Sequence, residues 1–454
     1  MSKSLELRGP VSERTVQTAL KLSVLDGALY AVMAGVGESY QAPLAVELGH
    51  QGTALAVLAS VPVLLGAVGQ LATAPLTTWI GTRRRFVASG ALLQALSHAG
   101  FAWLALTHSP SLFGFLALRV VFSLAGMMIA PAWGAWMATL VLEEQRQRFF
   151  AWRSALVQLV LLGCFVLGGQ HLQAHTEQHP RMLAFAHLML VSLVARSLSA
   201  ATLAVQADPH AAGEAPDTTT VERAKLALRH GRWKVALYVA ALTFGAHVAV
   251  PFFTPYMLET LGLDYSTFSS LTALSILCKV LILPLCHPLS QRFGLRSTLF
   301  LGGIGVAIVP YLWSLHPDYT HLLVIHMLSG FAWAIVEYAS FQLLLDSATD
   351  EFRIEFLSLA GMLGGAFQVA GSVVGGLLLD HAVLDYEQLF FASSIARTLP
   401  LALLLSLPAR YLPRQIPKTL FRFLGVLPVV GPLLRPIVPR SRDSEFPPKP
   451  ADKR

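Results

Sequence analysis

The chain contains 454 residues, of which 54% are hydrophobic and only 13% are charged. A soluble domain normally carries about twice that charged fraction, and the mean hydropathy is +0.59. The composition therefore excludes an ordinary soluble protein and indicates one that crosses a membrane many times. The net charge of +7 does not indicate a nucleic-acid partner, because the placement of basic residues relative to the membrane accounts for it.

Twelve apolar stretches follow one another along the chain, and most hold twenty or more residues. A helix of that length crosses a hydrocarbon core of about 30 Å. We therefore predict an all-α integral membrane protein with twelve transmembrane helices. The stretches are 22–48, 53–78, 86–106, 112–140, 150–170, 182–204, 234–258, 266–290, 297–315, 320–346, 354–380 and 386–408.

Lysine and arginine are sorted by these stretches. We number the gaps alternately, with the N-terminal tail on side one. Of the 33 basic residues, 28 then lie on side one, and Arg181 alone lies on side two. Basic residues concentrate on the cytoplasmic side of membrane proteins, so we predict that both termini are cytoplasmic and that the protein lies in the inner cell membrane. One helix more or fewer would destroy this sorting.

The longest polar interruption divides the helices six and six. We predict a cytoplasmic N-terminal tail (1–21), a six-helix bundle (22–204), a cytoplasmic central loop (205–233), a second six-helix bundle (234–408) and a basic, proline-rich tail (409–454). The tail is apolar in part but broken by prolines, so we expect it to hold an interfacial segment on the inner leaflet.

The two bundles repeat each other. APLTTWIGTR (74–83) matches HPLSQRFGLR (287–296), and ARSL (195–198) matches ARTL (396–399). Both halves run in the same direction, so they are parallel repeats related by an axis along the membrane normal. The fold expected is a pair of pseudo-symmetric six-helix bundles.

These features resemble the major facilitator superfamily of secondary transporters. The segments PAWGAWMATLVLEEQRQRFFAWR (131–153) and VPFFTPYMLETLGLDY (250–265) look like a bacterial branch of it. The resemblance implies two six-helix bundles and transport by alternating access. It also implies a loop motif, Gly-x-x-x-Asp-Arg-x-Gly-x-Arg/Lys, after helices 2 and 8.

The acidic residue of that motif is missing from both copies, because Thr78 and Gln291 take its place. In the family this residue helps to latch the cytoplasmic gate, so we expect the latch to be formed differently here. The candidate gate residues are Asp26, Gly81, Arg83, Arg146, Gln291, Arg292, Gly294, Arg296 and Arg353.

A few charged residues lie inside the apolar stretches. A charge at mid-bilayer costs about 2.5–3.5 kcal/mol on insertion scales, so such residues face a cavity or a partner. They are Asp26, Glu38, Arg119, Arg196, Lys279, Glu337 and Arg397.

Glu38 and Arg119 are the strongest site candidates. At a rise of 1.5 Å per residue, they lie roughly 15 and 10 Å below the outer ends of helices 1 and 4. In the superfamily both helices line the central cavity, so we hypothesise that the two side chains face each other across it. Glu38 would be the protonation site and Arg119 the contact for an anionic group. The alternative is a permanent ion pair that locks the helices together.

The remaining charges have weaker assignments. Lys279 and Glu337 either line the pathway or form local bonds. Asp26 is expected to pair with the basic segment that contains Arg146, Arg148 and Arg153. Arg196 and Arg397 occupy equivalent places in the two halves, so we expect structural roles, snorkelling or bonding to helix ends. Further candidates for substrate contact are Tyr40, Gln41 and His326.

The leading functional hypothesis is a monomeric secondary transporter of a small solute, driven by protons or another coupling ion. We slightly favour an amphipathic or organic-anion substrate. The chain has no Walker-type phosphate loop, and its three cysteines have no metal-ligand spacing, so we expect no ATP drive, cofactor or metal. His171, His175 and His179 could share a helix face, but a solvated loop is favoured. A non-transporting sensor or a membrane enzyme on a transporter-like scaffold remains the alternative.

Overall fold

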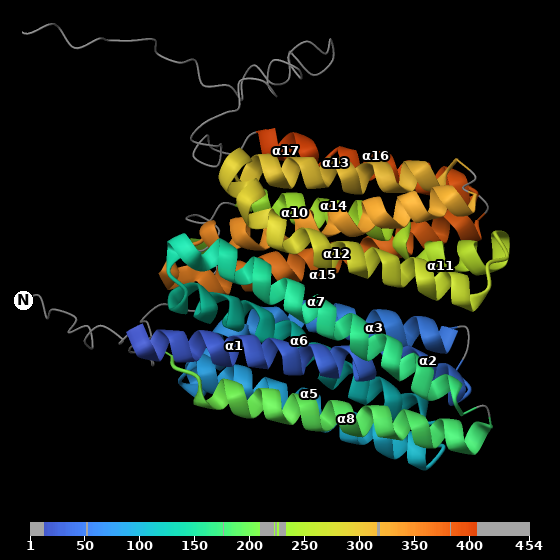
Figure 1. Ribbon diagram of the computed structural model, residues 1–454, viewed down its shortest axis with the longest axis horizontal. Coiled ribbons are helices and arrows are strands. Elements are labelled where there is room, and N and C mark those ends of the chain that lie inside the picture. The colour runs from blue at the N-terminus through green and yellow to red at the C-terminus, as the bar shows by residue number, and fades with distance from the viewer. Residues whose placement is uncertain are drawn as a thin grey trace, which may run out of the picture.

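The computed structural model describes residues 13–50, 53–175, 177–208, 222, 225–226, 233–315, 318–381 and 383–405. These residues form helices and no strands, arranged as two bundles that lie one above the other in Figure 1. The central loop lies mostly, and the C-terminal tail entirely, outside the described residues. Side one is the end at which α1 begins, on the left of Figure 1, and side two is the opposite end.

The N-terminal half contributes six helical passes, two of which are interrupted by a short π or 3-10 segment. Its elements are α1 (Glu13–Met33), η1 (Ala34–Glu38), α2 (Ser39–Glu47), α3 (Thr53–Gly69), η2 (Gln70–Ala72), α4 (Thr73–Ile80), α5 (Arg83–Leu106), α6 (Leu112–Leu140), α7 (Glu143–Gln173) and α8 (Gln178–Val205).

The C-terminal half contributes six more passes, and the seventh pass is broken three times near side two. Its elements are α10 (Trp233–His247), η3 (Val250–Phe252), α11 (Phe253–Pro255), η4 (Tyr256–Thr260), α12 (Tyr265–Phe293), α13 (Leu295–Trp313), α14 (Tyr319–Asp346), η5 (Asp350–Phe352), α15 (Arg353–Asp380), α16 (Tyr386–Thr398) and α17 (Leu401–Leu405).

The twelve predicted transmembrane passes are confirmed. Ten of them are long and apolar enough to cross a membrane, judged by helix length and composition alone. The other two are α5, which carries the polar residues Gln94, Ser97 and His98, and the last pass, which is interrupted between α16 and α17. Two helices begin well before their apolar stretches, α1 at Glu13 and α7 at Glu143. The basic segment after helix 4 is therefore the first part of α7 and not a loop.

Side-chain caps begin several helices at side two. Ser111, Asp264, Asp318 and Asp385 each accept a hydrogen bond from the backbone N–H three residues later. Such caps satisfy one of the free donors of a helix start. Asp318 also accepts from the His321 ring, and the backbone and side-chain hydrogen bonds from His321 hold the pKa of Asp318 below its ordinary value.

Glycine permits the closest helix contacts in the C-terminal half. A Cβ on Gly375 would lie 2.2 Å from the carbonyl oxygen of Val248, and one on Gly371 would lie 2.4 Å from that of Phe244. α15 therefore packs backbone to backbone against α10, as small residues allow in membrane helices.

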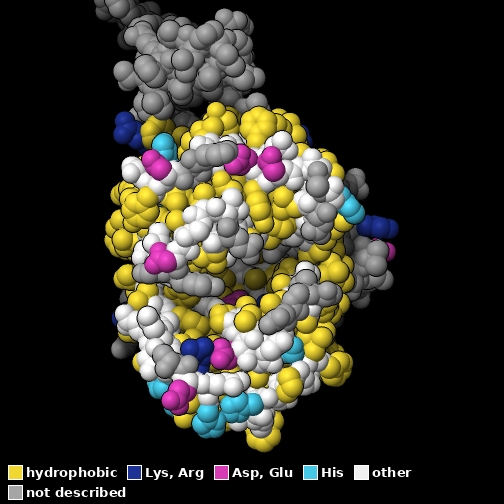
Figure 2. All heavy atoms as spheres, turned by 90° about the vertical axis from the view of Figure 1, so that its right-hand side faces the viewer, with side chains coloured by type: hydrophobic (Ala, Val, Ile, Leu, Met, Phe, Trp, Pro, Cys, Tyr) yellow, Lys and Arg dark blue, Asp and Glu magenta, His cyan; other side chains and the backbone are white. Residues whose placement is uncertain are grey.

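The halves meet along α3 with α15 and along α7 with α12. On side one they share an apolar core, in which Trp133 and Phe150 pack against Phe341 with ring centroids 6.4 and 5.0 Å from that ring. This plug closes the space between the halves at side one. Figure 2 shows the side-two face, which is hollowed between the halves. The protein is therefore closed at side one and open at side two.

Candidate functional site

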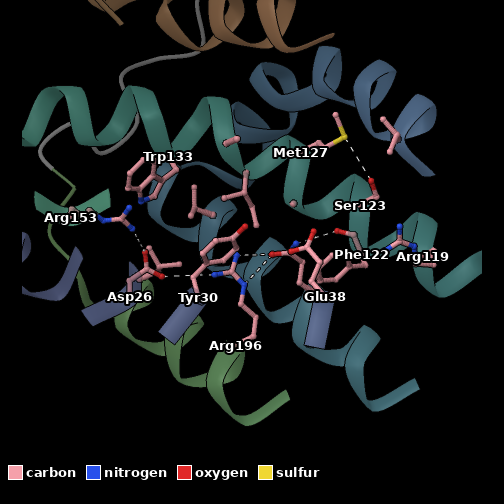
Figure 3. A pocket seen from close by; sticks show the side chains of 17 residues that line it. Asp26, Tyr30, Glu38, Arg119, Phe122, Ser123, Met127, Trp133, Arg153 and Arg196 are labelled. Atoms are coloured by element: carbon pink, nitrogen blue, oxygen red, sulfur yellow. Dashed lines mark hydrogen bonds and ion pairs between the residues drawn. The ribbon is translucent and has the colours of Figure 1, made fainter. Parts of the chain in front are cut away.

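A cavity of about 450 Å³ lies within the N-terminal half, next to the plug residue Trp133. Residues of α1, α3, α5, α6, α7 and α8 and of the π segment η1 line it, and five of them are charged (Figure 3). The main lining residues are Asp26, Tyr30, Glu38, Gln94, Arg119, Phe122, Ser123, Met127, Trp133, Arg153 and Arg196.

Glu38 is the last residue of η1, a π-turn that interrupts the first pass. Such turns insert one residue into a helix and often occur at functional sites. The Glu38 side chain points into the cavity, is exposed there, and makes no hydrogen bond or ion pair with any described residue. Arg119 and Arg196 are the cations that act on it electrostatically. An unpaired carboxylate at this depth is open to water and protons from side two.

Arg119 lies near Glu38 at the same end of the cavity (Figure 3). Its Nη1 donates to Oε1 of Gln41, and it has no ion pair with a described carboxylate. Gln41 is fully buried, and its Nε2 lacks a partner. The predicted juxtaposition of Glu38 and Arg119 in one cavity is therefore observed, but the alternative of a locked ion pair is not. Gln41 lies behind Arg119 and orients it, and it is not part of the cavity lining.

Asp26 anchors a buried cluster at the other end of the cavity. Its carboxylate lies 3.3 Å from Nη2 of Arg153 and 3.9 Å from Nη1 of Arg196. The Ser199 hydroxyl donates to the same carboxylate at 2.6 Å. Of the three arginines predicted as partners of Asp26, Arg153 is the one that binds it. One carboxylate thus serves two guanidinium groups.

Further contacts hold both arginines in place. Arg196 donates to Oε1 of Gln94 at 2.7 and 3.1 Å, and its guanidinium lies 5.1 Å from the ring centroid of Tyr30. Arg153 donates to the Ser23 carbonyl at 3.0 Å and lies 4.4 Å from the ring centroid of Trp133. Cation–π contacts of this kind stabilise a desolvated guanidinium.

The prediction that Arg196 and Arg397 snorkel or bond to helix ends is wrong for Arg196, whereas Arg397 does donate to the Ala246 carbonyl in the last turn of α10. Both are buried within their bundles, with exposures of 4% and 1%. Their environments also differ, since Arg397 donates to Ser393 and to the carbonyls of Val306 and Ala246 and has no ion pair with a described carboxylate. The repeat places the two arginines alike, but of the two it is Arg196 that lines the cavity described above.

Lys279 and Glu337 form an ion pair across α12 and α14, with Nζ and Oε1 2.6 Å apart. Phe341 lies one turn after Glu337 on the same helix face, and it packs on Trp133 of the other half. Lys279 lies about three turns before Ser290 on one face of α12, and the Ser290 hydroxyl donates to Gln147 of the other half at 3.0 Å. The pair therefore faces the N-terminal half, although it is not part of the cavity lining.

Two predicted substrate contacts lie away from this cavity. Tyr40 is buried, and its hydroxyl donates to the Phe165 carbonyl at 2.5 Å. His326 packs against Trp313 in the C-terminal half, with ring centroids 5.8 Å apart. Both contribute to packing in this structure.

The side-one gate candidates divide into two groups. Arg146 of α7 pairs with Asp346 of α14 at 3.2 Å, which ties the halves together. Gln147 adds two contacts, one from the Ser290 hydroxyl and one from the Tyr338 hydroxyl at 3.3 Å. This set, Arg146–Asp346 with Gln147, is called the side-one latch below.

The loop-motif residues do not join that latch. Gln291 and Arg292 are exposed, while Arg296 is buried. Arg353 pairs locally with Asp350 and donates to the Leu345 carbonyl at 3.3 Å. The remaining three terminate or begin helices at side one: Gly81, with φ 93°, Gly294, with φ 79°, and Arg83.

The described residues contain no group of three His, Cys, Asp or Glu side chains arranged to hold a metal ion. His171 and His175 are neighbours, with ring centroids 5.0 Å apart. His179 instead stacks on His108, at 5.3 Å. The three histidines at four-residue spacing therefore do not form one set.

Comparison with known proteins identifies the family. A model of the Major Facilitator Superfamily matches residues 27–256 and 235–440, so that each half is matched. The chain belongs to the major facilitator superfamily. No curated protein sequence matches it.

Solved transporter structures share the fold at low sequence identity. The proton:xylose symporter XylE has a TM-score of 0.68 at 14% identity, covering 86% of this chain and 95% of its own. The E. coli fucose:proton symporter FucP scores 0.71 at 12% identity, with 86% and 98% covered. The human organic anion transporter MFSD10 scores 0.64 at 14% identity, with 87% and 100% covered. These likenesses establish the fold of a membrane transporter.

Proposed function

We propose that this protein is a secondary active transporter that moves a small organic anion by alternating access, coupled to a proton carried on Glu38. One observation carries the proposal: among the described residues, the Glu38 carboxylate has no hydrogen-bond or ion-pair partner, and it lies in a cavity beside Arg119, whose one side-chain partner in that part of the chain is the neutral Gln41. Charged groups left unpaired inside a membrane protein mark substrate and proton pathways.

The two groups are arranged to couple their ligands. With Glu38 ionised, its charge balances that of Arg119. A substrate carboxylate that binds the Arg119 guanidinium removes this balance. It favours protonation of Glu38, because two anions beside one cation repel each other. Substrate and proton thus bind cooperatively and cross together.

The closed plug and the open side-two face indicate where loading occurs. Substrate and proton enter from side two, and the side-one latch must break before release. Because side one carries the basic residues, we assign it to the cytoplasm and the protein to the inner membrane, where it works as a monomer. Apolar and aromatic lining residues such as Phe122, Met127 and Trp133 suit an amphipathic anion. XylE and FucP are proton symporters and MFSD10 is an organic anion transporter, and these functions support the proposal.

A ligand screen followed by a transport assay tests the proposal. Thermal shift of the purified protein against organic acids, sugars, amino acids, peptides and lipophilic cations identifies a ligand. A ligand at 100 times its dissociation constant adds about 2.7 kcal/mol of stability. Uptake of that ligand into proteoliposomes is then measured over a pH series.

Glu38→Gln is expected to abolish the pH dependence of uptake, whereas wild-type uptake follows the proton gradient. Glu47→Gln is the matched control, because Glu47 lies on the same pass but pairs with Arg181 at 3.4 Å outside the cavity. Full transport by Glu38→Gln with unchanged pH dependence would rule out the carrier role of Glu38. A screen in which only cations bind would rule out the anion assignment.

A further inference from the structure

The charges that line the cavity do not cancel. Three arginines (Arg119, Arg153 and Arg196) face two carboxylates (Asp26 and Glu38), and the lining contains no lysine, histidine or other acid. The resident charge is therefore +1 when Glu38 is ionised and +2 when it is protonated. The nearby Lys279–Glu337 pair is neutral as a unit and leaves this difference unchanged.

The excess charge is built into the fold. Arginine stays protonated at any physiological pH. Asp26 is already shared between Arg153 and Arg196, which also bind Ser23 and Gln94, so neither guanidinium can leave the cluster without breaking several bonds. The excess of one cation therefore persists for as long as this cluster is intact.

The cost of that charge depends on the state of the transporter. In the present state the cavity opens to side two, and water and bulk anions screen the charge. Alternating access requires a state closed on both sides, in which the same charge is removed from water. From the cost of a single charge in a membrane interior, an empty closed state is on the order of 100-fold less populated than a neutral one.

We infer that this protein exchanges anions: the halves reorient only while the bound ligand, together with any proton on Glu38, adds a net charge of −1 to the cavity, in both directions of the cycle. A dianion satisfies this with Glu38 protonated, so that anion and proton cross together, whereas a monoanion satisfies it with Glu38 ionised and crosses without a proton. The inference goes beyond the proposed function, since proton coupling through Glu38 requires no anion on the return step.

Ser123 allows a test that leaves the charged residues intact. It lines the cavity on α6, and its hydroxyl bonds to the sulfur of Met127, at 3.8 Å, and to no other described residue. Ser123→Asp lowers the resident charge to zero, and Ser123→Asn is the matched neutral control. Met127→Glu and Met127→Gln provide a second pair at the neighbouring lining position.

Reorientation is read from spin labels on cysteines placed at Phe113 and Tyr319, exposed residues near the side-two ends of α6 and α14. Cys164, Cys278 and Cys286 are replaced by alanine beforehand. The distance distribution is measured in buffer whose sole anion is polyglutamate, which is too large for the cavity, and again after addition of benzoate, succinate or phosphate.

Wild type and Ser123→Asn are expected to stay open at side two in polyglutamate, whereas Ser123→Asp closes there without added anion, with a closed fraction larger by a factor of roughly 100. This arm needs no identified substrate. Equal closed fractions in Ser123→Asp and Ser123→Asn, repeated in the Met127 pair, would overturn the inference, as would free closure of the wild type in polyglutamate.

Counterflow gives an independent readout. Uptake of labelled benzoate, or of whichever probe shifts the label distance, is compared in vesicles with and without the same anion inside. Internal anion is expected to raise wild-type and Ser123→Asn uptake at least tenfold and to leave Ser123→Asp unaffected. Wild-type uptake that is equally fast into anion-free vesicles and still depends on pH would reject exchange while leaving the proton role of Glu38 intact.

Discussion

Substituting Asp26 by asparagine should destabilise the N-terminal half strongly. Asp26 is the sole carboxylate within ion-pair distance of Arg153 and Arg196 among the described residues, and its side chain is 5% exposed. Removing one partner of a buried ion pair costs about 3–5 kcal/mol, because the remaining charge stays buried. Here two guanidinium groups lose their counter-ion, so the upper end of this range applies.

The change is measured as the midpoint of thermal unfolding of the purified protein, followed by tryptophan fluorescence. For a unit of about 200 residues, a loss of 3–5 kcal/mol lowers the midpoint by roughly 6–20 °C. Asp346→Asn is the control, because the Asp346 side chain is 28% exposed in its ion pair with Arg146. A partly exposed pair contributes at most about 1 kcal/mol.

A double mutant separates charge from packing. Arg196→Gln in the Asp26→Asn background removes one of the two uncompensated cations, so it should restore part of the lost stability, even though Arg196→Gln alone destabilises. Interaction energies of this sign are measurable in contacting pairs. The reasoning is refuted if Asp26→Asn unfolds within 2 °C of wild type, or if the double mutant is less stable than Asp26→Asn.

Two further predictions concern packing and the latch. Gly375→Ala should lower the unfolding midpoint or abolish expression, because the added Cβ would lie 2.2 Å from the Val248 carbonyl oxygen. Gly364→Ala is the control and should be tolerated, because the space around Gly364 is open. Equal stability of the two variants would contradict the close packing of α15 on α10. Asp346→Asn removes the ion pair to Arg146. It should raise the fraction of protein that is open at side one about fivefold, which corresponds to roughly 1 kcal/mol, and this fraction is measured by chemical labelling of a cysteine placed in the plug. Unchanged labelling would show that the plug alone keeps side one closed.

Most of what could be predicted from the sequence came from the positions of its charged residues. The sorting of lysine and arginine requires an even number of crossings between the tails, and the twelve passes are confirmed. It also placed Asp26 near the basic segment that forms the start of α7, where Arg153 binds it. Such predictions work because membrane insertion depends on hydropathy and charge along the chain, and less on tertiary contacts.

The details of the site depend on features with no local signal. Nothing in Ala-Gly-Val-Gly-Glu marks a π-turn, yet that turn sets the direction of Glu38. The partner of Arg119 is a glutamine in another helix, and no spacing rule distinguishes Gln41 from a second acid. The repeat likewise predicted equal roles for Arg196 and Arg397, but the presence of Asp26, Gln94 and Ser199 around the first decides their difference.

The location of the cavity has a consequence for how specificity can change. Every residue that lines it lies between 26 and 203, so on the proposed function the first half of the duplicated chain recognises the substrate, and the second half provides the surface against which the first half moves. Selection on the substrate then acts on one repeat, while the other is free to diverge as long as it keeps the plug and the contacts along α3 and α7. A chimera that joins this first half to the second half of another family member with a compatible interface should retain the ligand preference of this protein.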